Sequence, residues 1–183
     1  MSIIGLVSLT LYGQTSITPS SGNGTVVNPY QITTLQNLYW IAENSSRWGY
    51  HYVQTSNIDA SETNNWFPDG AGSYYGWTPI GKEYVGDFTG SYNGNGYNIK
   101  GLFINRTSED YQGLFGRTSG ATISNLGLVD VEIHGRHYSA GLVGYNNNNS
   151  TVTNCYSIGN VTGSWHVGGL VADNYSSTVS NCY

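Results

Sequence analysis

Residues 139–161, SAGLVGYNNNNSTVTNCYSIGNV, decide how this chain folds, because two other stretches repeat them. The stretch GLVADNYSSTVSNCY begins at Gly169 and the stretch GLFGRTSGATISNLGLVDV begins at Gly113. The three copies therefore start 28 residues apart, at Gly113, Gly141 and Gly169. A fixed period of this length is typical of proteins that stack one structural unit many times. The sequence predicts a repeat architecture.

Apolar and polar residues alternate over short runs within a copy. Residues 129–134 read Val-Asp-Val-Glu-Ile-His, the period-two pattern of a half-buried strand. One copy holds only two or three such strands, too few to bury its own hydrophobic side. Stacking solves this, because each copy then pairs its backbone with the next at about 4.8 Å and adds to a common core. The sequence predicts an all-β, right-handed parallel β-helix, with the handedness usual for parallel crossovers.

Equivalent positions in the copies predict columns of like side chains. Ile123–Leu126 aligns with Val152–Cys155 and with Val179–Cys182, and Ile99–Leu102 is taken as a weaker fourth copy. Each copy has one Asn at the equivalent position. This predicts hydrogen bonds between the side-chain amides along a column, as in Asn ladders of stacked strands. These residues are Asn125, Asn154 and Asn181.

Cys155 and Cys182 share a second column. Two cysteines in an exported chain suggest a disulfide. In-register side chains point in parallel, however, which leaves the Cβ atoms too far apart for a relaxed bridge. Cys also replaces Leu126 in this column, so a stack of buried thiols is favoured, with the disulfide kept as the alternative.

The segment before the repeats predicts a single α-helix. Leu35, Leu38 and Ile41 recur at helical spacing in NPYQITTLQNLYWIAE, and Thr33 with Gln36 is placed as a capping box. The first repeat of a solenoid exposes an unpaired edge and an open core. We expect this helix to cover both.

The chain divides into three segments. Residues 1–21 are interpreted as the remnant of an export signal and leader, with an ordinary first strand as the alternative, because the apolar run lacks a basic region before it. Residues 22–85 form an N-terminal cap with the helix and an aromatic loop. The repeats occupy residues 86–183, divided into 86–112, 113–140, 141–168 and an incomplete 169–183. Because the last repeat stops midway, either the natural protein continues or the open edge joins another copy.

Composition excludes several classes of partner. Only 9% of the 183 residues are charged, the net charge is -5, and there are six Lys and Arg in total. Such a chain has no basic surface with which to neutralise phosphates, so nucleic acid is excluded as a partner. The apolar run near the N-terminus is too short to span a membrane.

Aromatic residues supply the candidate binding sites. Exposed rings stack on sugars or anchor protein partners, although a cluster of rings can equally pack a cap onto the first repeats. The candidate ligand-binding residues in the loop are Trp66, Phe67, Tyr74, Tyr75 and Trp77. A second possible surface patch at a repeat corner comprises Arg136, His137, Tyr138, Trp165 and His166.

No arrangement of residues predicts catalysis or a cofactor. The outward carboxylates of residues 130–132 gain no acidic partner in the next copy, which favours a solvated face over an acid–base pair. No metal site is predicted. Calcium remains possible, without the loop of an EF-hand, at three scattered carboxylates: Asp59, Asp69 and Asp87.

The repeated motif resembles one known family. GLVG at residues 141–144, followed by NCY and GNVTG, resembles the GLUG motif, which repeats in bacterial surface and secreted proteins. These include large adhesins and some IgA-cleaving peptidases outside their catalytic domains. The preceding NPYQITTLQNLYWIAE and FTGSYNGNGYNIKGLFIN resemble the leaders of such arrays, so the likeness covers residues 22–183. One departure is Ala172, which replaces the second Gly of the motif.

The resemblance implies a β-helical segment that is secreted or displayed on a cell surface. We therefore expect a non-enzymatic adhesion or scaffold module, whose partner is a host or neighbouring cell-surface protein or glycan. One alternative is a carbohydrate-binding module or a fragment of a glycan-active β-helix enzyme. Another is a filament subunit that joins through open solenoid ends.

Overall fold

The structure, a computed structural model, describes residues 14–183. Most of the predicted export-signal remnant lies outside the described residues. The described chain is built mostly of short parallel strands, with one α-helix, α1 (Leu35–Glu43), near its start. Two short 3₁₀ helices follow it, η1 (Ser45–Arg47) and η2 (Ser61–Asn65).

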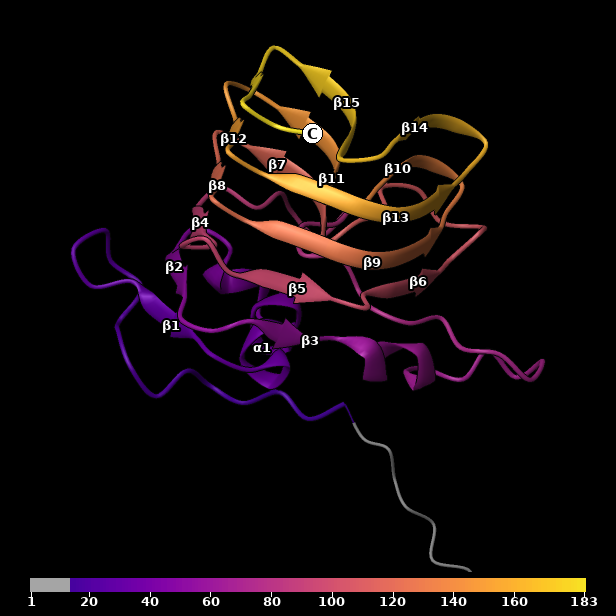
Figure 1. Ribbon diagram of the computed structural model, residues 1–183, viewed down its shortest axis with the longest axis horizontal. Helices are drawn as coiled ribbons and strands as arrows, with labels where there is room; N and C mark the ends of the chain where they lie inside the picture. The colour runs from indigo at the N-terminus through magenta and orange to yellow at the C-terminus, as the bar shows by residue number, and fades with distance from the viewer. Residues whose placement is uncertain (1–13) are drawn as a thin grey trace, which may run out of the picture.

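The strands stack turn upon turn into a solenoid (Figure 1). One sheet has six strands, in the order β1 (Tyr30–Ile32), β2 (His51–Gln54), β4 (Ser91–Asn93), β8 (Thr122–Ser124), β12 (Thr151–Thr153) and β16 (Thr178–Ser180). A second comprises β3 (Ile58–Asp59), β5 (Asn98–Lys100), β9 (Gly127–His134) and β13 (Tyr156–Thr162), and β6 (Phe103–Asn105) also pairs with β9. The third holds β7 (Phe115–Ser119), β11 (Val143–Asn147) and β15 (Val171–Tyr175), and a fourth holds β10 (His137–Ala140) and β14 (Trp165–Gly168).

The register between turns follows the repeat. Val143 pairs with Phe115 and with Val171, at the 28-residue spacing. Thr151 pairs with Thr122 and Thr178, so the middle copy carries its extra residue in the corner between β11 and β12. An extra residue in a corner leaves the inward and outward faces of the strands unchanged. The predicted parallel β-helix with one helix near the N-terminus is confirmed.

The alignment of the weaker fourth copy is wrong. Tyr92, not Ile99, pairs with Ile123, and Ile99 pairs with Leu128 in the next sheet. A buried Tyr therefore stands in the column where later turns place Ile and Val. The six-stranded sheet also has strands from before residue 86, because β1 and β2 pair in it ahead of β4.

The alternation expected over residues 129–134 is interrupted by a bulge. Asp130 has φ of 54°, and the pairing of β9 with β13 shifts there, so that Ile158 faces Val129 while Gly159 faces Val131. Val131 is buried and Val129 is only half-buried. A bulge adds one residue to a strand and changes which side chains point inward.

The N-cap of helix α1 is Thr34, one residue after the predicted Thr33. The Thr34 side chain, not that of Thr33, accepts a hydrogen bond from the Asn37 backbone N–H at 3.2 Å. Gln36 instead donates to Glu62 at 3.1 Å. Both threonines are acceptable N-cap residues, so the sequence alone did not separate them.

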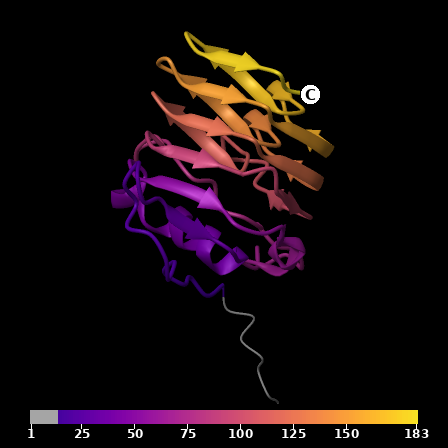
Figure 2. The same cartoon turned by 60° about the vertical axis from the view of Figure 1, so that its left-hand side comes forward.

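The helix lies at the N-terminal end of the stack, opposite the last turn (Figure 2). Its Leu38 and Ile41 are fully buried. The ring of Tyr39 lies 4.8 Å from that of Trp66 and 6.0 Å from that of Trp77. The indole of Trp77 in turn donates to the Leu114 carbonyl in the repeats. Aromatic packing thus joins the helix to the solenoid.

The second Gly of the repeated motif is needed for close packing. A Cβ atom at Gly144 would lie 2.5 Å from the Tyr138 carbonyl and 2.8 Å from that of Gly116. These two carbonyl oxygens leave no room for a side chain at Gly144 within β11.

Candidate functional site

A column of aromatic side chains runs along one corner of the solenoid. Tyr111, Tyr138 and His166 contribute one ring from each of three successive turns. The rings of Tyr111 and Tyr138 stack with centroids 4.8 Å apart, and those of Tyr138 and His166 with centroids 4.6 Å apart. We call these three residues the aromatic column.

The backbone of the aromatic column is left-handed. The φ angles are 61° at Tyr111, 57° at Tyr138 and 52° at His166. Bulky residues rarely adopt this conformation, and where they do the surrounding structure must stabilise it. The stacking of each ring on the next turn supplies that stabilisation.

A second column flanks the first. Arg117, Tyr145 and Asp173 pair in register on β7, β11 and β15. The Arg117 guanidinium lies over the rings of Tyr111 and Tyr145, at 4.9 and 5.6 Å from their centroids. His166 Nδ1 approaches Asp173 at 3.5 Å. The two columns form one surface of rings and charges that extends across the turns.

The structure brings the predicted corner patch to the same edge. His137 pairs with Trp165 in register, with ring centroids 5.8 Å apart, and 70% of Trp165 is exposed. Arg136 binds Asp110 through two hydrogen bonds of 2.7 and 2.8 Å. This contact lowers the pKa of Asp110. Tyr138 and His166 belong to the aromatic column itself.

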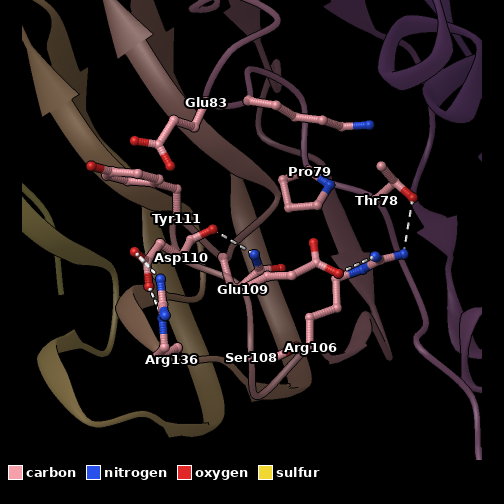
Figure 3. A pocket seen from close by; sticks show the side chains of 11 residues that line it. Thr78, Pro79, Glu83, Arg106, Ser108, Glu109, Asp110, Tyr111 and Arg136 are labelled. Carbon is pink, nitrogen blue, oxygen red and sulfur yellow. Dashed lines mark hydrogen bonds and ion pairs between the residues drawn. The ribbon is translucent and has the colours of Figure 1, made fainter. Parts of the chain in front are cut away.

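A cleft of about 340 Å³ opens beside the column (Figure 3). Lys82 and Glu83 line one wall, and residues 106 and 108–112 line the other. The Arg136–Asp110 pair and the Arg106–Glu109 pair stand on opposite sides of it, with Pro79 between them (Figure 3). The remaining lining residues are Thr78, Lys82, Glu83, Ser108, Tyr111 and Gln112.

The cleft gathers the positive charges of an acidic chain. Lys82, Arg106 and Arg136 line it, and Arg117 lines the adjoining hollow, so four of the six basic residues lie together. Arg106 is held firmly: Nη1 donates to Glu109 at 3.0 Å and Nε donates to the Trp77 carbonyl at 3.1 Å. Burial, and then the nearby Arg106, lowers the pKa of Lys82.

The aromatic loop divides between core and surface. Trp66 and Trp77 are 4% and 0% exposed, so neither ring presents a face to a ligand. Phe67 is partly buried against the core, and Tyr74 is half-buried. Tyr75 is the most exposed of the five, and the Arg106 guanidinium lies over its ring at 5.4 Å.

The side chains considered for metal binding are engaged separately. Asp87 pairs with Arg117 at 2.7 Å, Asp69 accepts from the backbone of its own loop, and Asp59 accepts from Ser61. Within residues 14–183, no group of three or more His, Cys, Asp or Glu is placed to hold a metal ion.

The structural columns lie on another side of the turns. Asn154 Nδ2 donates to Asn125 Oδ1, and Asn125 Nδ2 donates to Asn93 Oδ1, both at 3.0 Å. Cys155 and Cys182 are free thiols, buried and half-buried respectively. Burial is the first cause that raises the pKa of Cys155, to about 11.

Sequence reasoning missed Tyr111, Arg117, Tyr145, Lys82 and Glu83. Arg117 and Tyr145 were within reach, because they recur with Asp173 at the 28-residue period of the motif. Lys82 and Glu83 lie before the recognisable repeats and carry no periodic signal.

Stacked turns that present columns of side chains define a repeat module with an elongated surface. Residues 135–162 match the family model of the GLUG motif, so the resemblance to GLUG-repeat proteins is confirmed. Halomucin of Haloquadratum walsbyi is 37% identical over 153 residues, which are 83% of this chain and 2% of Halomucin. A Gly-rich membrane protein of Evansella cellulosilytica is 41% identical over 110 residues, 60% of this chain and 11% of that protein.

The immunoglobulin A1 protease of Streptococcus sanguinis is 30% identical over 150 residues, which are 82% of this chain and 7% of the protease. The chain thus spans at most 11% of each of these relatives. No solved structure matches it significantly. Over residues 14–183, the structure has no helix with the length and apolar character needed to cross a bilayer.

Proposed function

We propose that this chain is a non-enzymatic adhesion or scaffold module of a secreted or cell-surface protein. The GLUG motif and relatives named Halomucin, a Gly-rich membrane protein and an immunoglobulin A1 protease support a surface location. The observation that carries the proposal is the aromatic column with its flanking column. Together they offer a ligand surface that lengthens with every turn.

The chemistry of this surface suits recognition of another molecule. Aromatic rings and Arg are the side chains most enriched where proteins bind partners. Here the Tyr138 ring stacks on Tyr111 and His166 of the two neighbouring turns, and the Tyr145 ring contacts those of Tyr111 and Tyr138. These contacts order both rings, so little conformational entropy is lost on binding. The partner we propose is a protein or glycan of a host or neighbouring cell.

A binding assay on intact cells tests this proposal. Fluorescently labelled chain is applied to a monolayer of epithelial cells, and retention is compared with that of Tyr138→Ala. Tyr156→Ala is the matched control, because Tyr156 also stacks on the next turn, with Tyr183 at 5.2 Å, but outside the aromatic column. We expect Tyr138→Ala to lose retention and Tyr156→Ala to keep it. Equal retention by both variants and the original chain contradicts the proposal.

Carbohydrate binding is the second candidate function, and the cleft of Figure 3 favours it. Its walls carry carboxylates, guanidinium groups and the hydroxyl of Ser108, which suit a ligand rich in hydroxyl groups. A glycan array tests it. Because Trp66 and Trp77 are buried, the informative variant is Tyr75→Ala, whose ring borders Arg106 at the surface. Binding to no glycan contradicts this candidate.

A further inference from the structure

The cleft contains two charged side chains that are not neutralised by a partner. Its two arginines are paired with carboxylates at 3.0 Å or less. Lys82 and Glu83 line the same space, and among residues 14–183 neither forms an ion pair. Both are half-buried rather than freely solvated. Charged groups in this situation gain from a ligand that supplies the missing partners.

Lys82 and Glu83 act at opposite ends of the cleft. Besides Glu43, the charges that affect Lys82 are those of Arg106 and Glu109. Burial, and then the carboxylate of Glu83, raises the pKa of Tyr111. In Figure 3, Glu83 and Tyr111 lie on the side of the cleft away from Arg106 and Thr78. The cleft is therefore positive at one end and accepts hydrogen bonds at the other.

The positive end has an unmet requirement for an anion. Lys82 loses hydration on burial and stands near the Arg106 guanidinium, a second positive charge. The carboxylate of Glu109 is already engaged by Arg106 at 3.0 Å. A ligand carboxylate placed here would form a charge-assisted hydrogen bond with the Lys82 ammonium.

The size and lining of the cleft fit one sugar residue. A volume of about 340 Å³ lies at the lower end of the range of small-ligand sites, about 300–1,000 Å³. That space is comparable to one sugar ring with its substituents. Pro79, an apolar residue, also lines the cleft.

We propose that this cleft binds an acidic sugar residue of a polysaccharide, with its carboxylate at Lys82 and its hydroxyl groups at Glu83 and Ser108. This inference rests on the carbohydrate-binding candidate above and names its ligand class. An acidic peptide fits less well, because Glu83 and Glu109 repel further carboxylates but accept hydrogen bonds from hydroxyl groups.

Titration calorimetry on the full chain tests the inference with two matched probes. One is an oligosaccharide of a hexuronic acid, and the other is the same oligosaccharide with its carboxyl groups reduced to alcohols. We expect the acidic form to bind roughly tenfold or more tightly, the size of one hydrogen bond to a charged group. Added salt should weaken the binding of the acidic oligosaccharide only.

Three variants locate the effect. Lys82→Gln should abolish the preference for the acidic form, and Lys82→Arg, which keeps the positive charge, should retain it. Lys100→Gln is the matched control. Lys100 is on β5, pairs with Asp130 at 3.4 Å and does not line the cleft. Far-ultraviolet circular dichroism of each variant establishes that it is folded.

Each other outcome overturns the inference. Equal binding of both probes, or equal losses in Lys82→Gln and Lys100→Gln, removes the role of Lys82. Binding of oligoglutamate as tight as that of the oligouronate assigns the cleft to acidic peptides. If neither probe binds but neutral glycans bind on the array, acidic-sugar recognition is wrong and carbohydrate binding stands. If no glycan of any kind binds, both are wrong.

Discussion

Corner residues of the turns adopt a backbone conformation that most L-amino acids avoid. Asn125, Asn154 and Asn181 have φ of 53°, 53° and 54°. This left-handed conformation costs about 1–2 kcal/mol for an ordinary residue, and Asn is among the few that tolerate it. One Asn per turn therefore closes the corner, and Asn125 and Asn154 also supply amides to the hydrogen-bonded column.

Asn154 separates the two contributions. Replacing it with Ala removes the 3.0 Å hydrogen bond to Asn125 and places a Cβ-bearing residue at positive φ. We expect Asn154→Ala to lower the free energy of unfolding by about 2 kcal/mol, and Asn154→Gly by roughly 1 kcal/mol less than that. Urea denaturation of the three proteins measures this. Equal losses for Ala and Gly would show that backbone strain is unimportant here.

The two cysteines should differ in reactivity. Burial raises the pKa of Cys155 to about 11, so its thiolate is scarce at pH 8, and the side chain is also inaccessible. Cys182 is half-buried. We expect iodoacetamide at pH 8 to modify Cys182 first and Cys155 only after denaturation, as read by peptide mass spectrometry. Two unreactive sulfurs that become reactive only after reduction would instead indicate a disulfide.

At the scale of elements, α1 depends on the aromatic loop for its place in the fold. Tyr39 of the helix contacts Trp66 and Trp77, and Trp77 is anchored to Leu114 in the repeats at 3.2 Å. The loop thus connects the helix to the solenoid through buried rings. Its tryptophans contribute to stability in a way that their position in a long loop does not reveal.

Trp77 is the residue on which this contact most depends. We expect Trp77→Ala to lower the free energy of unfolding by about 3–5 kcal/mol, the usual cost of emptying a buried aromatic site. Tyr84→Ala, at a side chain that is 99% exposed, is the control and should change it by no more than about 0.5 kcal/mol. Thermal unfolding followed by near-ultraviolet circular dichroism measures both. Similar midpoints for the two variants would contradict the structure.

At the scale of the whole molecule, charge is distributed very unevenly among the faces. Four of the six basic residues surround the cleft and the aromatic column. The strands of the six-stranded sheet from β4 onward, Ser91–Asn93, Thr122–Ser124, Thr151–Thr153 and Thr178–Ser180, contain no charged residue. These four strands therefore offer no charged side chain to a ligand.

The described fold should be stable without calcium. Asp59, Asp69 and Asp87 are bound to separate protein partners and do not converge on one point. A ligand that binds only the folded state raises the unfolding temperature. We expect neither added calcium nor a chelator to shift the unfolding midpoint in differential scanning calorimetry. A rise with calcium that a chelator reverses would reveal a metal site.

The sequence by itself determined the stacked architecture, because a turn that cannot bury its own apolar residues must repeat them at a constant period. The 28-residue spacing of Gly113, Gly141 and Gly169 was sufficient for this, and helical spacing was sufficient for α1. Where the period was masked, as at Tyr92, the alignment of the early turn was wrong. The bulge at Asp130 was also not predicted, because no residue type by itself indicates a positive φ or a shifted register.

Only the tertiary structure decided which aromatic and charged residues meet at a surface. The local sequence does not distinguish the buried Trp77 from the exposed Trp165, since both are large rings near turns. Lys82 and Arg136 are far apart in the chain and line one cleft because stacking places successive corners side by side. Contacts between turns depend on the register of the whole stack, and a local stretch of sequence does not contain that register.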